Sequence, residues 1–367
     1  MRSYSHKPRA QTPGDWRLKI PTRVTLTDVA REAGVSRTTA SFVLAGRGEE
    51  MRISPQVVVR VRSKAREMKY RPNVVSRNLR TGTTQTIGFV SDTVATTPFA
   101  GHLIWGALDA ARERDHLLLI AETEGDAELE RQQIEAMVDR RVDGIIFASM
   151  YTRKLRSPQA MFDTPSVLLN ALPEEPGALP AVLPDEVGAG RTAGQLLLRA
   201  GHAGGIFGVG AEPLRERCPG DSLAALERLR GVKEALGAAG VQLAGGVLCS
   251  QWHPRDGYDA TARLLKRNGK PEALICFNDR LSVGAYQALE DAGMKVGDDV
   301  SVVSFDDEPV ASWLRPGLTS IALPHYQLGR MAVEVLLDRG GKPGAAGCRV
   351  HRVPMPLRER ASVRPCG

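Results

Sequence analysis

The sequence of 367 residues predicts an α/β protein in which a small helical domain precedes a body of two doubly wound parallel-sheet subdomains. Two observations predict this class. From residue 86 onward, apolar runs of four to seven residues alternate with amphipathic stretches, a pattern typical of parallel strands covered by helices on both faces. Between residues 24 and 70, apolar residues recur at helical spacing instead.

Charge is divided unevenly between these two parts. Residues 1–82 carry 18 basic and 6 acidic side chains, a net charge of +12, whereas the remaining 31 basic and 36 acidic side chains give −5. A basic front on a mildly acidic body favours a polyanionic partner for the front alone, although a merely solvated basic surface has the same composition.

Composition also excludes several classes of protein. No run of 18 apolar residues is present, so we expect no membrane span. The N-terminus lacks the apolar region of a secretion signal. Five widely spaced cysteines without a C-x-x-C pair favour reduced thiols in the cytoplasm over a disulfide framework or a zinc site. We expect neither a metal ion nor a cofactor.

Residues 24–70 are expected to form three short helices behind a disordered basic arm over residues 1–23. Thr25 to Asp28 can cap the first helix, which Gly34 ends, and Ser36 can cap the second. Ser54 before Pro55 predicts the start of the third helix. Two helices joined by a tight glycine turn predict a helix-turn-helix, whose second helix enters the DNA major groove. A three-helix adaptor without a DNA role remains the alternative.

The second helix, within Ser36–Gly46, is predicted to have two different faces. Its apolar stripe consists of Ala40, Val43 and Leu44. Its other stripe consists of Arg37, Thr38, Ser41, Phe42 and Ala45. Phe42 is the large apolar residue on this otherwise polar face.

Residues 71–83 form the predicted connection to the body. The polar stretch from Asn73 to Arg80 is too short to be stable as an isolated helix in water, so we expect it to become ordered only against a partner.

The body is expected to contain eight strands and at least six helices. The strands are Thr86–Ser91, Leu117–Ala121, Gly144–Ala148, Ser166–Leu169, Gly205–Val209, Gly246–Cys249, Ala273–Phe277 and Val300–Phe305. The helices are Phe99–Arg114, Glu128–Arg140, Gly188–Ala200, Leu223–Ala239, Tyr258–Arg267 and Asp279–Ala292.

Long stretches resemble the LacI/GalR family of transcription regulators, which is the lac-repressor type. These are VTLTDVAREAGVSRTTASFVLAG, ISPQVVVRVRSKAREMKYRPNVVSRNLRTGTTQTIGFV, PFAGHLIWGALDAARERD, RRVDGII, GYDATARLL, FNDRLSVGAYQALEDAGMKVGDDVSVVSFDD and PMPLRERAS. The resemblance covers residues 24 to about 362. It implies a periplasmic-binding-protein-like body over residues 84–362, in which the chain crosses between subdomains near residues 184 and 322.

The resemblance also implies roles in DNA binding. Arg37 and Thr38 fall where the family reads bases, Phe42 where many members carry arginine, and Ala45 where many carry asparagine. Residues 71–83 resemble the family's hinge helix, in which Leu79 takes the position of a minor-groove wedge. The loop Gly46–Ile53 is longer than usual. The remaining expected DNA contacts are Thr25, Ser36, Ser41, Arg47, Arg52, Asn73 and Ser76.

A ligand site is expected where the strands of the body end, because ligands of doubly wound sheets bind beyond the carboxyl ends of the strands. Asn170, Asn278 and Asp306 each follow or end such a strand. The further candidates are Phe99, Arg228 and Trp252. Polar groups and aromatic rings together suit a hydroxyl-rich or planar ligand. Each residue also has a simpler interpretation as a helix cap or a core side chain, and the resemblance favours the ligand site.

The sequence therefore predicts a ligand-controlled repressor that binds a near-palindromic operator as a homodimer, with a sugar or nucleoside-like effector. We expect no enzyme, because the sequence contains no P-loop, G-x-S-x-G or H-E-x-x-H motif. Two alternatives stay open, a solute-binding protein of sugar transport and a sugar-metabolising enzyme with a DNA-binding front.

Overall fold

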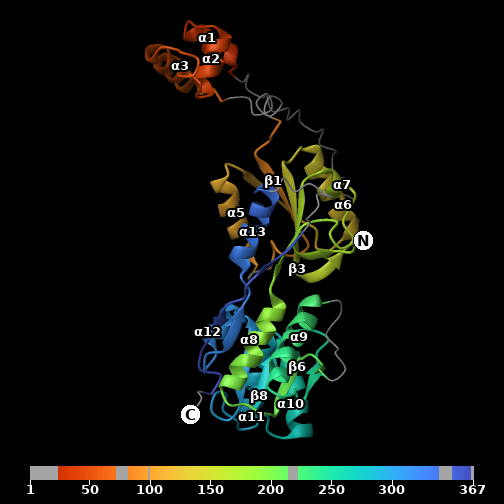
Figure 1. The fold of residues 1–367 in the computed structure, drawn as a ribbon. Helices are drawn as coiled ribbons and strands as arrows, with labels where there is room; N and C mark the ends of the chain where they lie inside the picture. The colour runs from red at the N-terminus through yellow and green to blue at the C-terminus, as the bar shows by residue number, and fades with distance from the viewer. Residues whose placement is uncertain (1–23, 72–81, 98–99, 214–221, 339–348, 365–367) are drawn as a thin grey trace, which may run out of the picture. The chain divides into compact units, whose positions relative to one another are not determined.

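The computed structural model describes residues 24–71, 82–97, 100–213, 222–338 and 349–364, and the chain separates into two compact units, residues 1–82 and 83–367 (Figure 1). The first is the front unit and the second is the body.

The front unit contains three helices, α1 (Leu26–Glu32), α2 (Arg37–Leu44) and α3 (Pro55–Glu67). Thr25 forms a reciprocal capping box with Asp28, and the Ser36 hydroxyl accepts a hydrogen bond from the Thr39 amide. Both predicted caps are therefore confirmed. Ser54 precedes Pro55 as expected, but its side chain makes no cap hydrogen bond. Proline at the first turn has no amide N–H to be satisfied, and its fixed φ is already helical. Both properties reduce the need for a cap hydrogen bond.

The two faces of α2 are confirmed. Ala40 and Val43 are fully buried, and together with Val29 and Val61 they form the small core that joins the three helices. The opposite stripe is exposed or half-buried.

The first sheet of the body has the strand order β11-β5-β4-β3-β1-β2, and its pairs are all parallel. Its strands are β1 (Thr86–Ser91), β2 (Leu117–Glu122), β3 (Gly144–Leu155), β4 (Ser166–Pro173), β5 (Ala181–Pro184) and β11 (Val350–Val353). Helices α5 (Gly101–Glu113) and α13 (His325–Asp338) pack side by side on one face. Helices α6 (Ala127–Asp139) and α7 (Ala160–Asp163) cover the other face.

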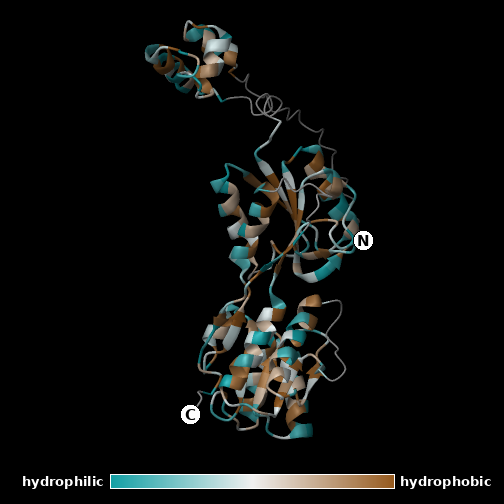
Figure 2. Ribbon diagram, in the orientation of Figure 1, coloured by the Kyte–Doolittle hydropathy of each residue, from teal (hydrophilic) through white to brown (hydrophobic). Residues whose placement is uncertain are grey.

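The second sheet has the order β12-β10-β9-β8-β6-β7, in which only the edge strand β12 runs antiparallel. Its strands are β6 (Ile206–Gly210), β7 (Gly245–Leu248), β8 (Ala273–Cys276), β9 (Ser301–Asp306), β10 (Thr319–Ala322) and β12 (Leu357–Arg358). Its helices are α8 (Glu186–Arg199), α9 (Leu223–Ala238), α10 (Pro254–Asn268), α11 (Asp279–Asp291) and α12 (Pro309–Trp313). The pairs α8–α9 and α10–α11 each pack closely. Figure 2 shows the apolar residues concentrated on the strands inside each sheet.

Two doubly wound sheets are as predicted, but the sequence analysis missed β5, β10, β11 and β12 as well as α13. None of the four missed strands is a continuous apolar run: β5 ends in Pro184, β10 begins with two hydroxyl residues, and β11 and β12 each contain an arginine. They also mark where the chain changes sheets. It passes from the first sheet to the second after Pro184, returns after Ala322, and crosses once more between Val353 and Leu357.

Candidate functional site

The polar face of α2 is the first candidate surface. Arg37 and Thr38 are exposed at the start of the helix, whereas Ser41 and Phe42 are half-buried. The hydroxyls of Thr25 and Ser36 are engaged in helix caps. Arg37 and Thr38 therefore have the access that reading base edges in a groove requires.

Phe42 lies beneath an arginine from the loop that follows α2. The guanidinium of Arg47 sits over the Phe42 ring, 5.4 Å from its centroid. The same guanidinium donates to the carboxylate of Glu50, with Nε 2.7 Å from Oε2. Arg47 is thus held by two partners within the front unit, whereas Arg52 is exposed on the same loop.

Several of the predicted features lie outside the residues that the structure describes. They are the basic arm over residues 1–23, the expected DNA contacts Asn73, Ser76 and Leu79, and the expected ligand residue Phe99.

The second candidate surface is a pocket of about 420 Å³ in the body. Residues of the first sheet and residues of the second sheet both line it. Five of the expected ligand residues line it together, namely Asn170, Arg228, Trp252, Asn278 and Asp306. Apolar contributions come from Met150, Tyr151 and Leu323.

Arg228 on α9 organises the floor of this pocket. Its side chain is only 3% exposed and bonds both oxygens of Glu186 at the start of α8, at 2.6 and 3.0 Å. Its Nη2 also donates to Asp306 at 2.8 Å, and its Nη1 donates to the Phe277 carbonyl at 2.7 Å. Burial alone would lower the pKa of Arg228, but the attraction of Glu186 and Asp306 outweighs it and raises that pKa. Arg228 is therefore a fixed cation that orients the Asp306 carboxylate.

Trp252 and Asn278 contribute a free donor and a fixed amide. The indole Nε1 of Trp252 is buried and has no hydrogen-bond partner among the described residues. Asn278 caps α11 through its Oδ1, which accepts from the Leu281 amide at 2.8 Å, while its Nδ2 donates to the Trp252 carbonyl at 3.4 Å. The cap interpretation of Asn278 is confirmed, and the ligand-site interpretation stays a prediction. A buried indole N–H without a partner is costly.

Asn170 is positioned by the first sheet. It has a left-handed backbone (φ 56°), its Oδ1 accepts from the Thr152 hydroxyl at 2.6 Å, and its Nδ2 donates to the Ser149 carbonyl at 3.0 Å. These bonds fix the orientation of the amide at the edge of the pocket.

Sequence reasoning missed several lining residues, chiefly Glu186, Arg280, Glu308 and His325. Glu186 follows the undetected strand β5, and His325 begins the undetected helix α13. Arg280 donates to Glu308 at 2.9 Å. Burial lowers the pKa of His325, which favours the neutral ring with one donor and one acceptor. If β5 and α13 had been predicted, Glu186 and His325 would have been candidate ligand residues as well.

Comparison with known proteins identifies both units. Residues 25–73 match the model for bacterial regulatory proteins of the lacI family. Residues 84–360 match the model for periplasmic binding proteins and the sugar binding domain of the LacI family. The chain belongs to the LacI family. It is therefore a DNA-binding transcriptional regulator with a small-molecule-binding body, and members of this family are regulators rather than enzymes.

Relatives of this LacI-family regulator cover nearly its whole length. The ribose operon repressor of Escherichia coli (strain K12) is 31% identical over 345 residues, which are 92% of this chain and 99% of the relative. The lac repressor dimer bound to operator and the anti-inducer ONPF shares the fold, with a TM-score of 0.73 at 23% identity over 93% of this chain and 99% of that one. A LacI family regulator from Enterococcus faecium with bound ribose has a TM-score of 0.58 at 26% identity. The match covers 76% of this chain and 99% of that one.

Two further findings concern the described residues alone. None of their helices has the length and apolarity to cross a membrane. No group of three or more His, Cys, Asp or Glu side chains among them could hold a metal ion.

Proposed function

We propose that this LacI-family regulator is a repressor whose affinity for operator DNA is set by a neutral, hydroxyl-rich effector in the pocket around Arg228. The observation that carries this proposal is the combination, in one pocket, of the fixed Asp306 carboxylate with a buried Trp252 Nε1 that has no partner among the described residues. A donor and an acceptor held at set positions beside an aromatic ring suit a sugar or a nucleoside.

The charges in the pocket support a neutral effector. Its carboxylates are Glu186, Asp306 and Glu308, and its arginines are Arg228 and Arg280. Each arginine is already paired with a carboxylate of the lining. A phosphorylated effector would therefore meet one more negative than positive group, with no cation free to pair with it. Ribose is the first effector to test, because one similar protein is a ribose operon repressor and another has ribose bound in its structure.

We propose that two copies of the chain pair to read a near-palindromic operator. The edge strand β2 of the first sheet supports an interface between copies, because Leu117, Leu119 and Ile120 are exposed along it, Leu117 by 74%. An apolar edge strand is a liability in a monomer and is commonly covered by a partner.

The proposed DNA-binding domain is 24–70, followed by a hinge at 71–83 and an effector and dimerisation domain at 84–362. Arg37, Thr38, Ser41 and Phe42 face the groove in this proposal, with Leu79 as the minor-groove wedge. Since its target is bacterial DNA, we place its action in the cytoplasm.

The test combines an effector screen with DNA binding by the full-length protein. Ribose, cellobiose and purine nucleosides are titrated calorimetrically, with ribose 5-phosphate as the charged comparison. Fragments bound from a genomic library then give the operator, and its affinity is measured with and without the effector. We expect a neutral sugar or nucleoside to bind and to change operator affinity. Absence of salt-dependent DNA binding would favour a solute-binding protein, and turnover of the bound sugar would favour an enzyme.

A further inference from the structure

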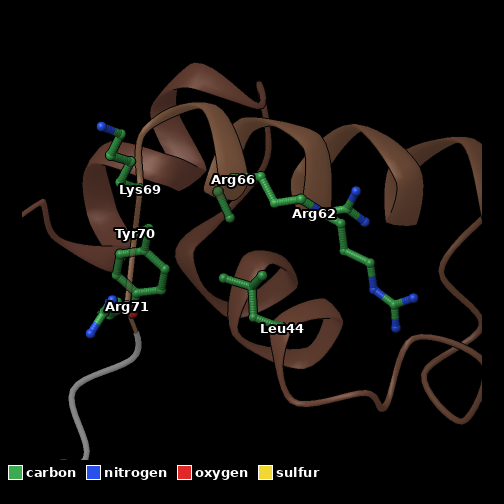
Figure 3. A pocket seen from close by; sticks show the side chains of 7 residues that line it. Leu44, Arg62, Arg66, Lys69, Tyr70 and Arg71 are labelled. Atoms are coloured by element: carbon green, nitrogen blue, oxygen red, sulfur yellow. The ribbon is translucent and has the colours of Figure 1, made fainter.

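The front unit has a strongly basic pocket that is separate from the polar face of α2. Its volume is about 530 Å³, and it lies between the end of α2 and the second half of α3. Four cationic side chains line it, those of Arg62, Arg66, Lys69 and Arg71. Figure 3 shows these side chains on α3 and on the segment that follows it, with Leu44 on the facing helix.

These four cations have no counterion within the described part of the chain. None of their side chains forms an ion pair or a hydrogen bond there, and no carboxylate lines the pocket. Lys64 on the same helix behaves differently, because its ammonium contacts Glu67 at 2.7 Å. Arg62 and Arg66 are four residues apart on α3, so their like charges repel and destabilise the helix slightly. An anion bound in the pocket would remove this repulsion.

The end of α3 holds the cluster in place. The Tyr70 amide donates to the Ala65 carbonyl at 2.8 Å, the Lys69 amide donates to the Arg66 carbonyl at 3.0 Å, and Lys69 has a left-handed backbone (φ 51°). This is the hydrogen-bond pattern of a Schellman motif, which turns the chain back at the helix end. It brings Lys69 and Arg71 to the same pocket as Arg62 and Arg66.

The segment that follows the pocket carries no acidic side chain in its sequence. The ten residues that follow, 72–81, contain Arg77 and Arg80 but no aspartate or glutamate. All four lining cations are exposed, which suits a repeating polyanion better than a small anion that must be enclosed. Leu44, which lines the pocket, is also the last residue of the helix that carries the base-reading face.

We propose that this pocket is an anion site that holds a phosphate of the DNA backbone, outside the base-reading face of α2. It anchors the front unit without contributing to sequence preference, because phosphate contacts carry no direct base information. This inference rests on the proposed DNA-binding function.

The test uses the full-length protein and a labelled DNA duplex of arbitrary sequence. Binding is measured by fluorescence anisotropy between about 50 and 200 mM salt for the wild type and for Arg62→Gln/Arg66→Gln. Loss of one phosphate contact reduces the slope of log affinity against log salt by about 0.9. The matched control is Lys64→Gln, which removes charge from the same helix but outside the pocket, and it should leave the slope nearly unchanged. A second variant, Lys69→Gln/Arg71→Gln, leaves α3 intact and should reproduce the effect if the first variant unfolds.

The possible outcomes separate the explanations. Equal slopes for the wild type and both pocket variants would overturn the phosphate site. If inorganic phosphate at constant ionic strength alters wild-type binding, and the pocket variants lose only this response, the site takes a free anion and the inference is wrong. If the wild type shows no salt-dependent binding at all, the proposed function itself fails.

Discussion

The guanidinium of Arg47 lies 5.4 Å from the centroid of the Phe42 ring and is held there by the carboxylate of Glu50. This arrangement explains an aromatic residue on the polar face of α2. The resemblance to the family implies that Phe42 takes a position where many members carry arginine, and here an arginine from the following loop is placed over it. The Phe42 ring thus holds the Arg47 guanidinium next to the polar face of α2.

We therefore predict that Phe42 and Arg47 specify the same base pair of the operator. Phe42→Leu keeps an apolar side chain but removes the ring face that attracts the cation, and Arg47→Gln removes the cation. Both variants should change the preference at one shared position when sites are selected from a random DNA library. Arg52→Gln on the same loop is the control and should leave this position unchanged. If only Phe42→Leu alters the preference, Phe42 contacts a base directly, as with a thymine methyl group.

A second prediction concerns the effector. Trp252→Phe keeps the aromatic surface but removes the indole N–H that has no partner among the described residues. The loss of this donor should weaken the binding of the sugar or nucleoside found in the screen by roughly tenfold, since an unpaired buried acceptor costs about 1–3 kcal/mol. Calorimetry measures the change. DNA affinity without effector should be unaffected.

Asp306→Asn provides an independent check of the same pocket. The amide oxygen can still accept from Arg228, so folding is retained, while the charge at the ligand position is lost. We expect operator binding without effector to persist and the response to effector to be lost. A wild-type response in this variant would argue that Asp306 only supports Arg228.

Some features of the fold and of the pocket depend on neighbouring residues, and others depend on residues far apart in the chain. The caps at Thr25 and Ser36 and the buried side of α2 follow from neighbouring residues, and they were predictable for that reason. The pocket was partly predictable, because Asn278 follows the apolar run Ala273–Phe277 and Asp306 follows Val300–Phe305. Glu186 was not, because the strand before it, β5, ends in a proline, and the role of Glu186 depends on an arginine 42 positions later in the chain. The contact of Arg47 with Phe42 depends on the conformation of a loop, which composition does not encode.

The buried ion pair of Arg228 and Glu186 gives a prediction about stability. Arg228→Met leaves the Glu186 carboxylate buried without its partner, which should lower the free energy of unfolding by about 3–5 kcal/mol. The pair Arg191–Glu234 joins the same two helices, but both side chains are more than 40% exposed. Arg191→Met should therefore cost less than about 1 kcal/mol. Urea denaturation of the two variants tests this, and equal losses would contradict it.

Stability should also depend on pH through Asp279, the first residue of α11. Its carboxyl accepts from the Glu308 amide at 2.6 Å and from the Ser320 hydroxyl at 2.8 Å, and burial raises its pKa from 3.8 to about 8. The folded protein therefore binds this proton more tightly than the unfolded chain does. The resulting stabilisation is complete below about pH 4 and is lost as the pH rises to about 8.

Asp279→Asn should remove this component. The amide oxygen can accept from the Glu308 amide, and its NH₂ can donate to the Ser320 hydroxyl oxygen, so the local hydrogen bonds are retained. We expect the wild type to lose more stability than Asp279→Asn between pH 5 and pH 9, as measured by urea denaturation at both values. The pKa values of Glu130 and Glu308 are also raised, so both groups also make stability fall with rising pH. Because both groups are present in the wild type and in the variant, the difference in stability loss between the two proteins is due to Asp279. Parallel pH profiles for the two proteins would show that Asp279 is ionised in the folded state throughout this range.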